Sequence, residues 1–370
     1  MSSGKIFEYK SDWFNYFESI LKHEYKEDRP NQNKIKAHII ESNYESIEEF
    51  AKHNKQVLLK KSKERDFHNV ILRSESTTPL HLYLDTEDSR FWVIHNIEPQ
   101  EKVKKLISQL FWESYLQDKI YIPNQTMEKY WKEYSSDSLG MSLKFKQLFL
   151  EEDIALADQV LSPSLGEDFD YTLRLWPKRF KTMDFFLEKF KEIGLPINFQ
   201  SLNYVFQNED GEIIMKEDFC FDGRLTVIRG KELYEHIKFI KLIRQDYSNK
   251  IDIIEDFRID WEHSKGDLFV ILYNKDIDPI LIYKTLIKNI KKFRIYLFKL
   301  YKQEDYILFD CIDAHTGGRF NLQIFKNKLY IKLKKDSCGN IIFRLFSNLQ
   351  KYLSPKCQLR IDNCDYDIMR

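Results

Sequence analysis

The sequence predicts an α+β fold made of antiparallel β-meanders that are each followed by helices. Two kinds of segment indicate this class: short runs of branched and aromatic residues between polar turns, and segments whose apolar residues recur at helical spacing. Several strands in succession, with helices after them, are typical of antiparallel sheets rather than of a doubly wound parallel sheet. The 370 residues, 43% of them apolar, are enough for two domains with sizeable cores.

The N-terminal part is predicted to hold two helices, four strands and a third helix. Ser11–Tyr25 carries apolar side chains at helical spacing, and Ser46 with Glu49 forms a capping-box pattern that begins a short helix. The four strand-like runs are Gln56–Lys60, Asn69–Arg73, His81–Asp85 and Arg90–His95. A helix is expected after Pro99, because proline suits the first helical turn.

An acidic stretch divides the chain. Residues 151–170 contain seven acids and no bases, together with one Pro and one Gly, which is typical of a solvated linker. We therefore expect an N-terminal α+β domain over residues 1–150 and a C-terminal α+β region over residues 171–370. A further division of that region near residue 275 would give three domains.

The C-terminal region is predicted to alternate between meanders and helices. Asp222-Gly223 is the strongest hairpin signal in the chain, and Asp278-Pro279 marks a helix start. The expected strands are Leu202–Phe206, Glu212–Lys216, Phe219–Phe221, Arg224–Arg229, Asp267–Tyr273, Tyr306–Cys311, Phe320–Phe325 and Lys328–Lys334. The expected helices are Asp184–Ile193, Glu232–Arg244, a helix after Pro279, and Ile341–Leu353.

The common catalytic motifs are missing from the sequence. It contains no phosphate-binding glycine loop, no G-x-G-x-x-G after a strand and no H-E-x-x-H, which weighs against nucleotide triphosphatases, Rossmann dehydrogenases and zincins. The five cysteines are odd in number and include no C-x-x-C pair, which weighs against a disulfide framework and a structural zinc site. We therefore expect no cofactor and no bound metal.

The termini and composition carry expectations about location. The N-terminus lacks the apolar core of a signal peptide, and no segment is apolar enough to cross a membrane, so we expect a cytoplasmic protein without membrane contact. The 28 Phe and 21 Tyr beside 11 Gly indicate an AT-rich genome and carry no information about activity.

Charge is balanced overall but unevenly distributed. The 58 Lys and Arg equal the 58 Asp and Glu, which rules out a wholly basic protein. Residues 281–335, however, contain 13 bases and four acids, a net charge of +9, and these bases are interleaved with aromatic residues. Lys and Arg neutralise phosphates, and aromatic faces stack on unpaired bases, so this segment is predicted to contact DNA or RNA.

The predicted nucleic-acid-binding side chains all lie in or directly beside this basic segment. They are Lys288, Lys291, Lys292, Arg294, Lys299, Lys302, Lys326, Lys328, Lys332, Lys334 and Lys335. From Lys328 to Lys335, basic and apolar residues alternate, which predicts a half-buried strand with a basic outer surface. The alternative is that these bases form an ordinary solvated surface.

Three functions are compatible with these features. The first is a non-catalytic subunit or adaptor of a larger assembly, which binds a protein partner and contacts nucleic acid through the basic C-terminal surface. The second is a metal-dependent nuclease with dispersed carboxylates, for which Asp310, Asp313 and His315, with Gln323 and Lys326, are the candidates. The third is a protein–protein interaction module without a nucleic-acid role.

Overall fold

The protein has an α+β fold, as predicted, with two antiparallel sheets and helices. This computed structural model describes residues 4–26, 34–74, 77–99, 103, 107–112, 114–134, 141–146, 170–175, 180–192, 197–303, 305–362 and 368–369. The chain forms two compact units. The first contains Met1–Ile120 and Asn203–Ser248, and the second contains Tyr121–Leu202 and Asn249–Arg370.

The two units do not follow one another along the chain. Each is built from two separate segments, with boundaries after Ile120, Leu202 and Ser248. The predicted acidic linker lies outside the described residues, apart from Asp170, which begins β8 (Asp170–Leu175).

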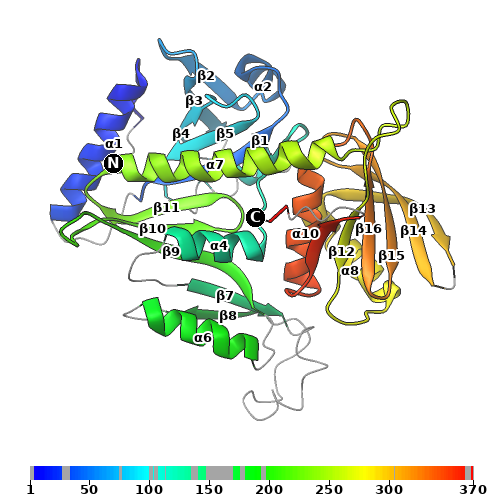
Figure 1. Cartoon of the computed structure of the whole chain (residues 1–370). Coiled ribbons are helices and arrows are strands. Elements are labelled where there is room, and N and C mark those ends of the chain that lie inside the picture. The colour runs from blue at the N-terminus through cyan, green and yellow to red at the C-terminus, as the bar shows by residue number, and fades with distance from the viewer. Residues whose placement is uncertain are drawn as a thin grey trace. The chain divides into compact units, whose positions relative to one another are not determined.

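The first unit contains an antiparallel sheet in the order β2–β3–β4–β5–β1–β11–β10–β9, with β6 paired to β1. Its strands are β1 (Lys36–Ser42), β2 (Val57–Lys61), β3 (Phe67–Ser74), β4 (Thr77–Asp85), β5 (Phe91–Asn96), β6 (Gln117–Lys119), β10 (Ile213–Cys220), β11 (Arg224–Gly230) and the end of β9 (Asn198–Gln207). Its helices are α1 (Lys10–Lys26), α2 (Ile47–His53), the π-helix η1 (Ser108–Trp112) and most of α7 (Leu233–Asp256) (Figure 1).

Apolar clusters form on both faces of this first sheet. One cluster contains Phe50 of α2 with Leu82 and Trp92 of the strands. The other contains Trp13 and Phe17 of α1 with strand side chains. The short helix α2 begins as predicted, because the Ser46 hydroxyl accepts a hydrogen bond from the Glu49 amide at 3.1 Å.

The β10–β11 hairpin corrects one detail of the prediction. The runs Glu212–Lys216 and Phe219–Phe221, expected as two strands, form the single strand β10, with a register shift between Lys216 and Glu217. The Asp222-Gly223 turn is confirmed: Gly223 has φ +74°, a conformation that favours glycine.

The second unit contains a six-stranded sheet, here called the second sheet, in the order β13–β14–β15–β16–β12–β17. Its strands are β12 (Phe269–Leu272), β13 (Ile295–Lys302), β14 (Tyr306–Asp313), β15 (Arg319–Phe325), β16 (Lys328–Leu333) and β17 (Gln358–Ile361). The helices of this unit are α4 (Asn124–Tyr134), α6 (Phe180–Glu192), α8 (Pro279–Lys288), α9 (Ile290–Phe293) and α10 (Asn340–Tyr352). In the same unit, β7 (Met141–Lys146) pairs with β8 and with the first residues of β9.

Helices cover one face of the second sheet. Tyr283 of α8 stacks on Phe309 of β14, with ring centroids 5.2 Å apart. Arg344 of α10 is fully buried and donates hydrogen bonds to the Asp313 carboxylate at the end of β14 and to the Phe293 carbonyl. The helix α10 is buried along almost its whole length and lies beside the strands of the second sheet (Figure 1).

Candidate nucleic-acid interface

The other face of the second sheet carries polar and aromatic side chains together with a few aliphatic ones. Burial alternates strictly along β14, β15 and β16: the apolar residues that face the helices are buried, and those between them are half-buried or exposed. We call this second set of side chains the outer face. Strand register places on it polar and charged side chains, aromatic rings and some aliphatic residues: Val270, Leu272, Tyr296, Phe298, Tyr301, Tyr306, Leu308, Asp310, Ile312, Arg319, Asn321, Gln323, Phe325, Lys328, Tyr330, Lys332, Gln358 and Arg360.

Three aromatic rings and a lysine cluster at one end of the outer face. The Tyr306 and Phe325 ring centroids are 5.3 Å apart, and those of Phe325 and Tyr330 are 5.8 Å apart. The Lys328 ammonium lies 4.8 Å from the Tyr330 ring centroid and donates a 2.9 Å hydrogen bond to the Tyr330 hydroxyl. Aromatic planes and a cation therefore stand side by side, which is the combination that stacks on bases and neutralises phosphates.

Further aromatic groups are exposed around the sheet. Tyr296 and Tyr301 of β13 are 61% and 53% exposed, and Trp261, in the loop before β12, is 72% exposed. The Lys332 ammonium lies 4.1 Å from the Trp261 ring centroid. Burial and the charge of neighbouring Lys334 lower the pKa of Lys332.

The charge of the outer face is predominantly positive. Among the described strand positions on this face, Asp310 is the one acidic residue, and its carboxylate accepts a hydrogen bond from the Asn321 side-chain amide. The bases Arg319, Lys328 and Lys332 are spread over β15 and β16. Such a face attracts phosphates along its length.

The fold separates the predicted basic residues into two groups. Lys328, Lys332 and Lys334 belong to β16 or directly follow it, and the alternation of the strand continues through Lys334 onto the outer face. Lys288, Lys291 and Lys292, in contrast, are exposed on α8 and α9, which belong to the helical layer.

The remaining predicted bases have other positions. Arg294 is only 8% exposed and forms the junction between α9 and β13 with φ +53°, so we leave it out of the interface. Lys302 is exposed and is paired with Ile307, so strand register places it on the face that the helices cover. Lys326 is exposed in the β15–β16 turn. Lys335 pairs with Asp260 at 3.0 Å, and the side chain of Lys299 lies outside the described residues. Sequence reasoning missed Trp261, which precedes the basic segment.

The carboxylates considered for a nuclease do not converge. Asp310 lies on the outer face beside Asn321, whereas Asp313 is fully buried on the helical side, where it pairs with Arg344. Gln323 is on the outer face, and Lys326 is in the following turn. A metal-dependent nuclease needs carboxylates that share one cation, and these two are held on opposite faces.

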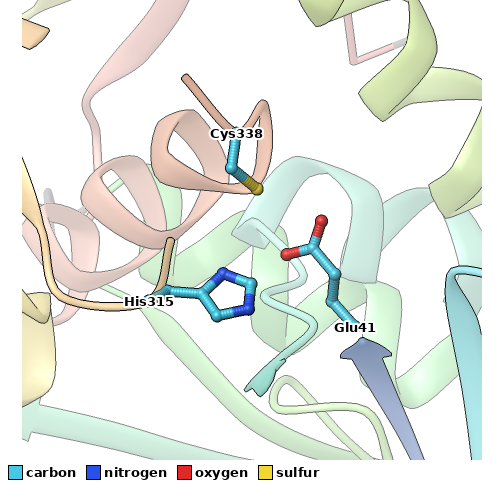
Figure 2. Close-up of side chains that lie close together, drawn as sticks. All are labelled: Glu41, His315 and Cys338. Carbon is cyan, nitrogen blue, oxygen red and sulfur yellow. The ribbon is translucent and has the colours of Figure 1, made fainter. Parts of the chain in front are cut away.

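Other groups of ligand-type side chains do not amount to a metal centre. Figure 2 shows His315, in the β14–β15 turn, and Cys338, just before α10, both buried in the second unit. A ring nitrogen of His315 and the Cys338 sulfur lie within 4.8 Å of each other, but two ligands are fewer than a structural zinc site requires. Glu41, which is also drawn there, belongs to the first unit. The half-buried Asp260 is engaged by ion pairs with His263 and Lys335.

The first unit contains a buried carboxylate–imidazole pair. Glu217 of β10 and His236 of α7 are fully buried, with Oε1 and Nδ1 2.6 Å apart, and burial raises the pKa of Glu217. The His95 ring lies 6.4 Å from that of His236, and burial lowers the pKa of His95 to about 3. We assign this group to the packing of α7 on the sheet, since both partners of the pair are inaccessible.

The buried cysteines lack the properties of nucleophiles. Burial raises the pKa of Cys220 and of Cys357 to about 12, and it also raises the pKa of Cys311. A thiol with so high a pKa forms almost no thiolate at neutral pH. Cys220, Cys311 and Cys357 therefore act as core residues.

Comparisons with known proteins define the family. No helix in the described part of the chain has the length and apolar character needed to span a membrane. No solved structure matches the chain. The chain is 24% identical over 367 residues to protein MJECL33 of Methanocaldococcus jannaschii, a match that covers 90% of this chain and 88% of that protein. The model of the MJECL33-like protein family matches residues 6–368, and the chain therefore belongs to the MJECL33-like family.

Proposed function

We propose that the protein is a non-catalytic subunit or adaptor that contacts nucleic acid through the outer face of the second sheet. One observation carries this proposal. Helices of the second unit cover one face of the second sheet, while its outer face interleaves aromatic rings with lysines and has a single acid among its described strand positions. Phosphate neutralisation provides affinity that does not depend on sequence, and exposed rings provide surfaces for base stacking.

A pair of matched variants tests the proposal. In the first, Lys328, Lys332 and Lys334 are changed to Glu, which reverses three charges on the outer face. In the second, Lys288, Lys291 and Lys292 are changed to Glu, which alters the net charge equally but on the helical layer. The readout is the fluorescence anisotropy of labelled DNA and RNA oligonucleotides at low and high salt.

The two variants are expected to behave differently. The outer-face variant should lose salt-sensitive binding, while the helical-layer variant should retain most of it. Equal losses in both variants would indicate a nonspecific charge effect, and the absence of binding in the unmodified protein would reject the proposal. Degradation of the oligonucleotide that requires Mg²⁺ or Mn²⁺ would instead favour a nuclease.

The adaptor part of the proposal concerns the setting of the protein. We propose a cytoplasmic location and a protein partner, and the four buried free cysteines Cys220, Cys311, Cys338 and Cys357 support a reducing compartment. Purification from native cells at low and high salt, with copurifying chains and nucleic acid measured, tests this part. A stoichiometric partner chain without nucleic acid would favour a pure protein–protein module.

A further inference from the structure

Trp261 is exposed far beyond what packing requires. Its side chain is 72% exposed, whereas Trp13, Trp92 and Trp131 are each at most 2% exposed. Exposing a large aromatic ring forgoes the favourable free energy of burying it. Such an exposed ring on a well-formed loop is accessible to a ligand that can stack on it.

The loop that carries Trp261 is closed by hydrogen bonds at its base. The backbone groups of Asp260 and Lys265 exchange two hydrogen bonds, of 3.0 and 3.1 Å, across the turn. The Asp260 carboxylate accepts from the Glu262 amide at 3.1 Å. Gly266 has φ +99°, and a Cβ there would lie 2.3 Å from the Arg258 carbonyl oxygen. The backbone of Gly266 therefore lies too close to that of Arg258 for any side chain.

The loop is also tied to the end of β16. Arg258 donates a 3.0 Å hydrogen bond to the Ser337 carbonyl, and the Ile259 amide donates a 2.9 Å hydrogen bond to the Leu333 carbonyl. Lys335 pairs with Asp260 at 3.0 Å. Trp261 is thus presented beside the outer face by a fixed turn, which lowers the entropic cost of binding through it.

Lys332 supports the indole ring through a cation–π contact. Its ammonium lies 4.1 Å from the ring centroid, and Lys332 itself is an outer-face residue. A ring can be approached from two sides, and with 72% of the residue exposed there is space for a second planar group. An unpaired base is such a group, and the ammonium beside the ring provides a positive charge close to the stacked nucleotide.

We propose that Trp261 stacks on an unpaired base and thereby makes the outer face select single-stranded over double-stranded nucleic acid. The proposal rests on the function proposed above. In a duplex the bases are stacked on one another and present no free face to an indole, while the phosphates remain available to the lysines. Removing the ring should therefore weaken binding to single strands and leave duplex binding unchanged.

The test compares Trp261→Ala with Trp261→Phe, which keeps an aromatic plane. Tyr234→Ala is the matched control, because Tyr234 is 61% exposed and lies on α7, in the first unit up to Ser248. The probes are labelled oligo-dT, oligo-U and a DNA duplex of equal length, so that DNA, RNA and duplex are separate arms. Far-UV circular dichroism and the melting temperature check the fold of each variant.

Trp261→Ala should bind single strands about 5- to 150-fold more weakly, the range that corresponds to losing one stacked base. Its duplex affinity should be unchanged, and Trp261→Phe should recover part of the loss. Quenching of tryptophan fluorescence by oligo-dT should disappear in Trp261→Phe, because the fluorophore at the contact is gone.

The outcomes separate this inference from the function on which it rests. If the unmodified protein binds none of the probes, both proposals fail. If the Lys328, Lys332 and Lys334 charge reversal abolishes binding while Trp261→Ala binds single strands normally, only the stacking role is overturned. An equal loss on duplex and single strands in Trp261→Ala would also overturn it.

Discussion

Two buried histidines should make the first unit sensitive to acid. His38 of β1 and His95 of β5 lie on opposite faces of the sheet, since His38 is paired with Ile94 and His95 with Ala37. Burial, together with Arg224, lowers the pKa of His38 to about 3, and burial also lowers the pKa of His95 to about 3, with Asp85 opposing the effect. Both side chains are therefore neutral in the folded unit at neutral pH.

The sign and size of the effect follow from proton linkage. In the unfolded chain each imidazole has a pKa of about 6.5, so the unfolded state binds more protons as the pH falls below that value. Each histidine's contribution is fully present above pH 6.5 and is progressively lost between about pH 6.5 and 3. Between pH 8 and pH 5 the loss amounts to about 2 kcal/mol for each histidine, or about 4 kcal/mol for the two.

The assay is urea unfolding at pH 8, 6.5 and 5, followed by tryptophan fluorescence. Trp13 is a suitable reporter, because its ring centroid lies 4.7 Å from that of His95. His95→Gln cannot be protonated in this pH range, so it should lose about 2 kcal/mol less than the unmodified protein between pH 8 and 5. His53→Gln is the control, since His53 is exposed at the end of α2.

One result would refute this reasoning. If His95→Gln and the unmodified protein lost the same unfolding free energy between pH 8 and pH 5, the buried imidazole would not be the group that takes up the proton. An equal gain in acid tolerance for His53→Gln would likewise point to a general charge effect.

Three further substitutions test the fold, two of them near the site and one in the first unit. Arg344→Met leaves the buried Asp313 carboxylate without its cation and should lower the unfolding free energy in urea by about 3–5 kcal/mol. Arg344→Met combined with Asp313→Leu should recover much of this loss, and the absence of any recovery would contradict the pairing. Gly266→Ala places a side chain on a left-handed backbone against Arg258 and should lower the unfolding free energy by about 1–3 kcal/mol. The fluorescence of Trp261 should change as well, and an unchanged melting temperature would contradict the tight turn. Ser46→Ala removes the N-cap of α2 and should cost about 1 kcal/mol, while a neutral result would mean that water replaces the cap.

Local patterns were sufficient to predict the core of the second sheet. The strands β14, β15 and β16 and the helix α10 form close to where the alternation and the helical spacing indicated, because apolar residues at period two must share one face of a strand. The start of α8 followed from Asp278, whose carboxylate accepts a hydrogen bond from the Ile280 amide at 2.9 Å.

The central strand of the first sheet could not be recognised locally. The segment Lys36–Ser42 forms β1, with all seven residues buried. Its Lys, His, Glu and Ser side chains suggest an exposed segment, because polar residues are rarely buried without partners. The partners come from far away in sequence: Lys36 donates to the Glu98 carbonyl at 2.8 Å, and Glu41 accepts from Arg90 at 2.8 Å.

Only part of the candidate site was accessible from the sequence. The basic segment was evident from charge, but the layer in which each base lies depends on where the chain changes from helix to strand. Arg294 marks this change and is buried by it, while Lys291 and Lys292 remain on the helix before it. Trp261 joins the outer face through contacts with β16, about 70 residues later, which no local pattern encodes.

The salt dependence of oligonucleotide binding tests the central claim most directly. The unmodified protein and a variant with Lys328, Lys332 and Lys334 changed to Gln would be titrated with labelled oligo-dT at several salt concentrations. If these lysines neutralise phosphates, the slope of log K against log salt should become shallower by about 2, since each lost phosphate contact on a single strand contributes about 0.7. An identical slope for the two proteins would contradict the assignment of the outer face as the nucleic-acid interface.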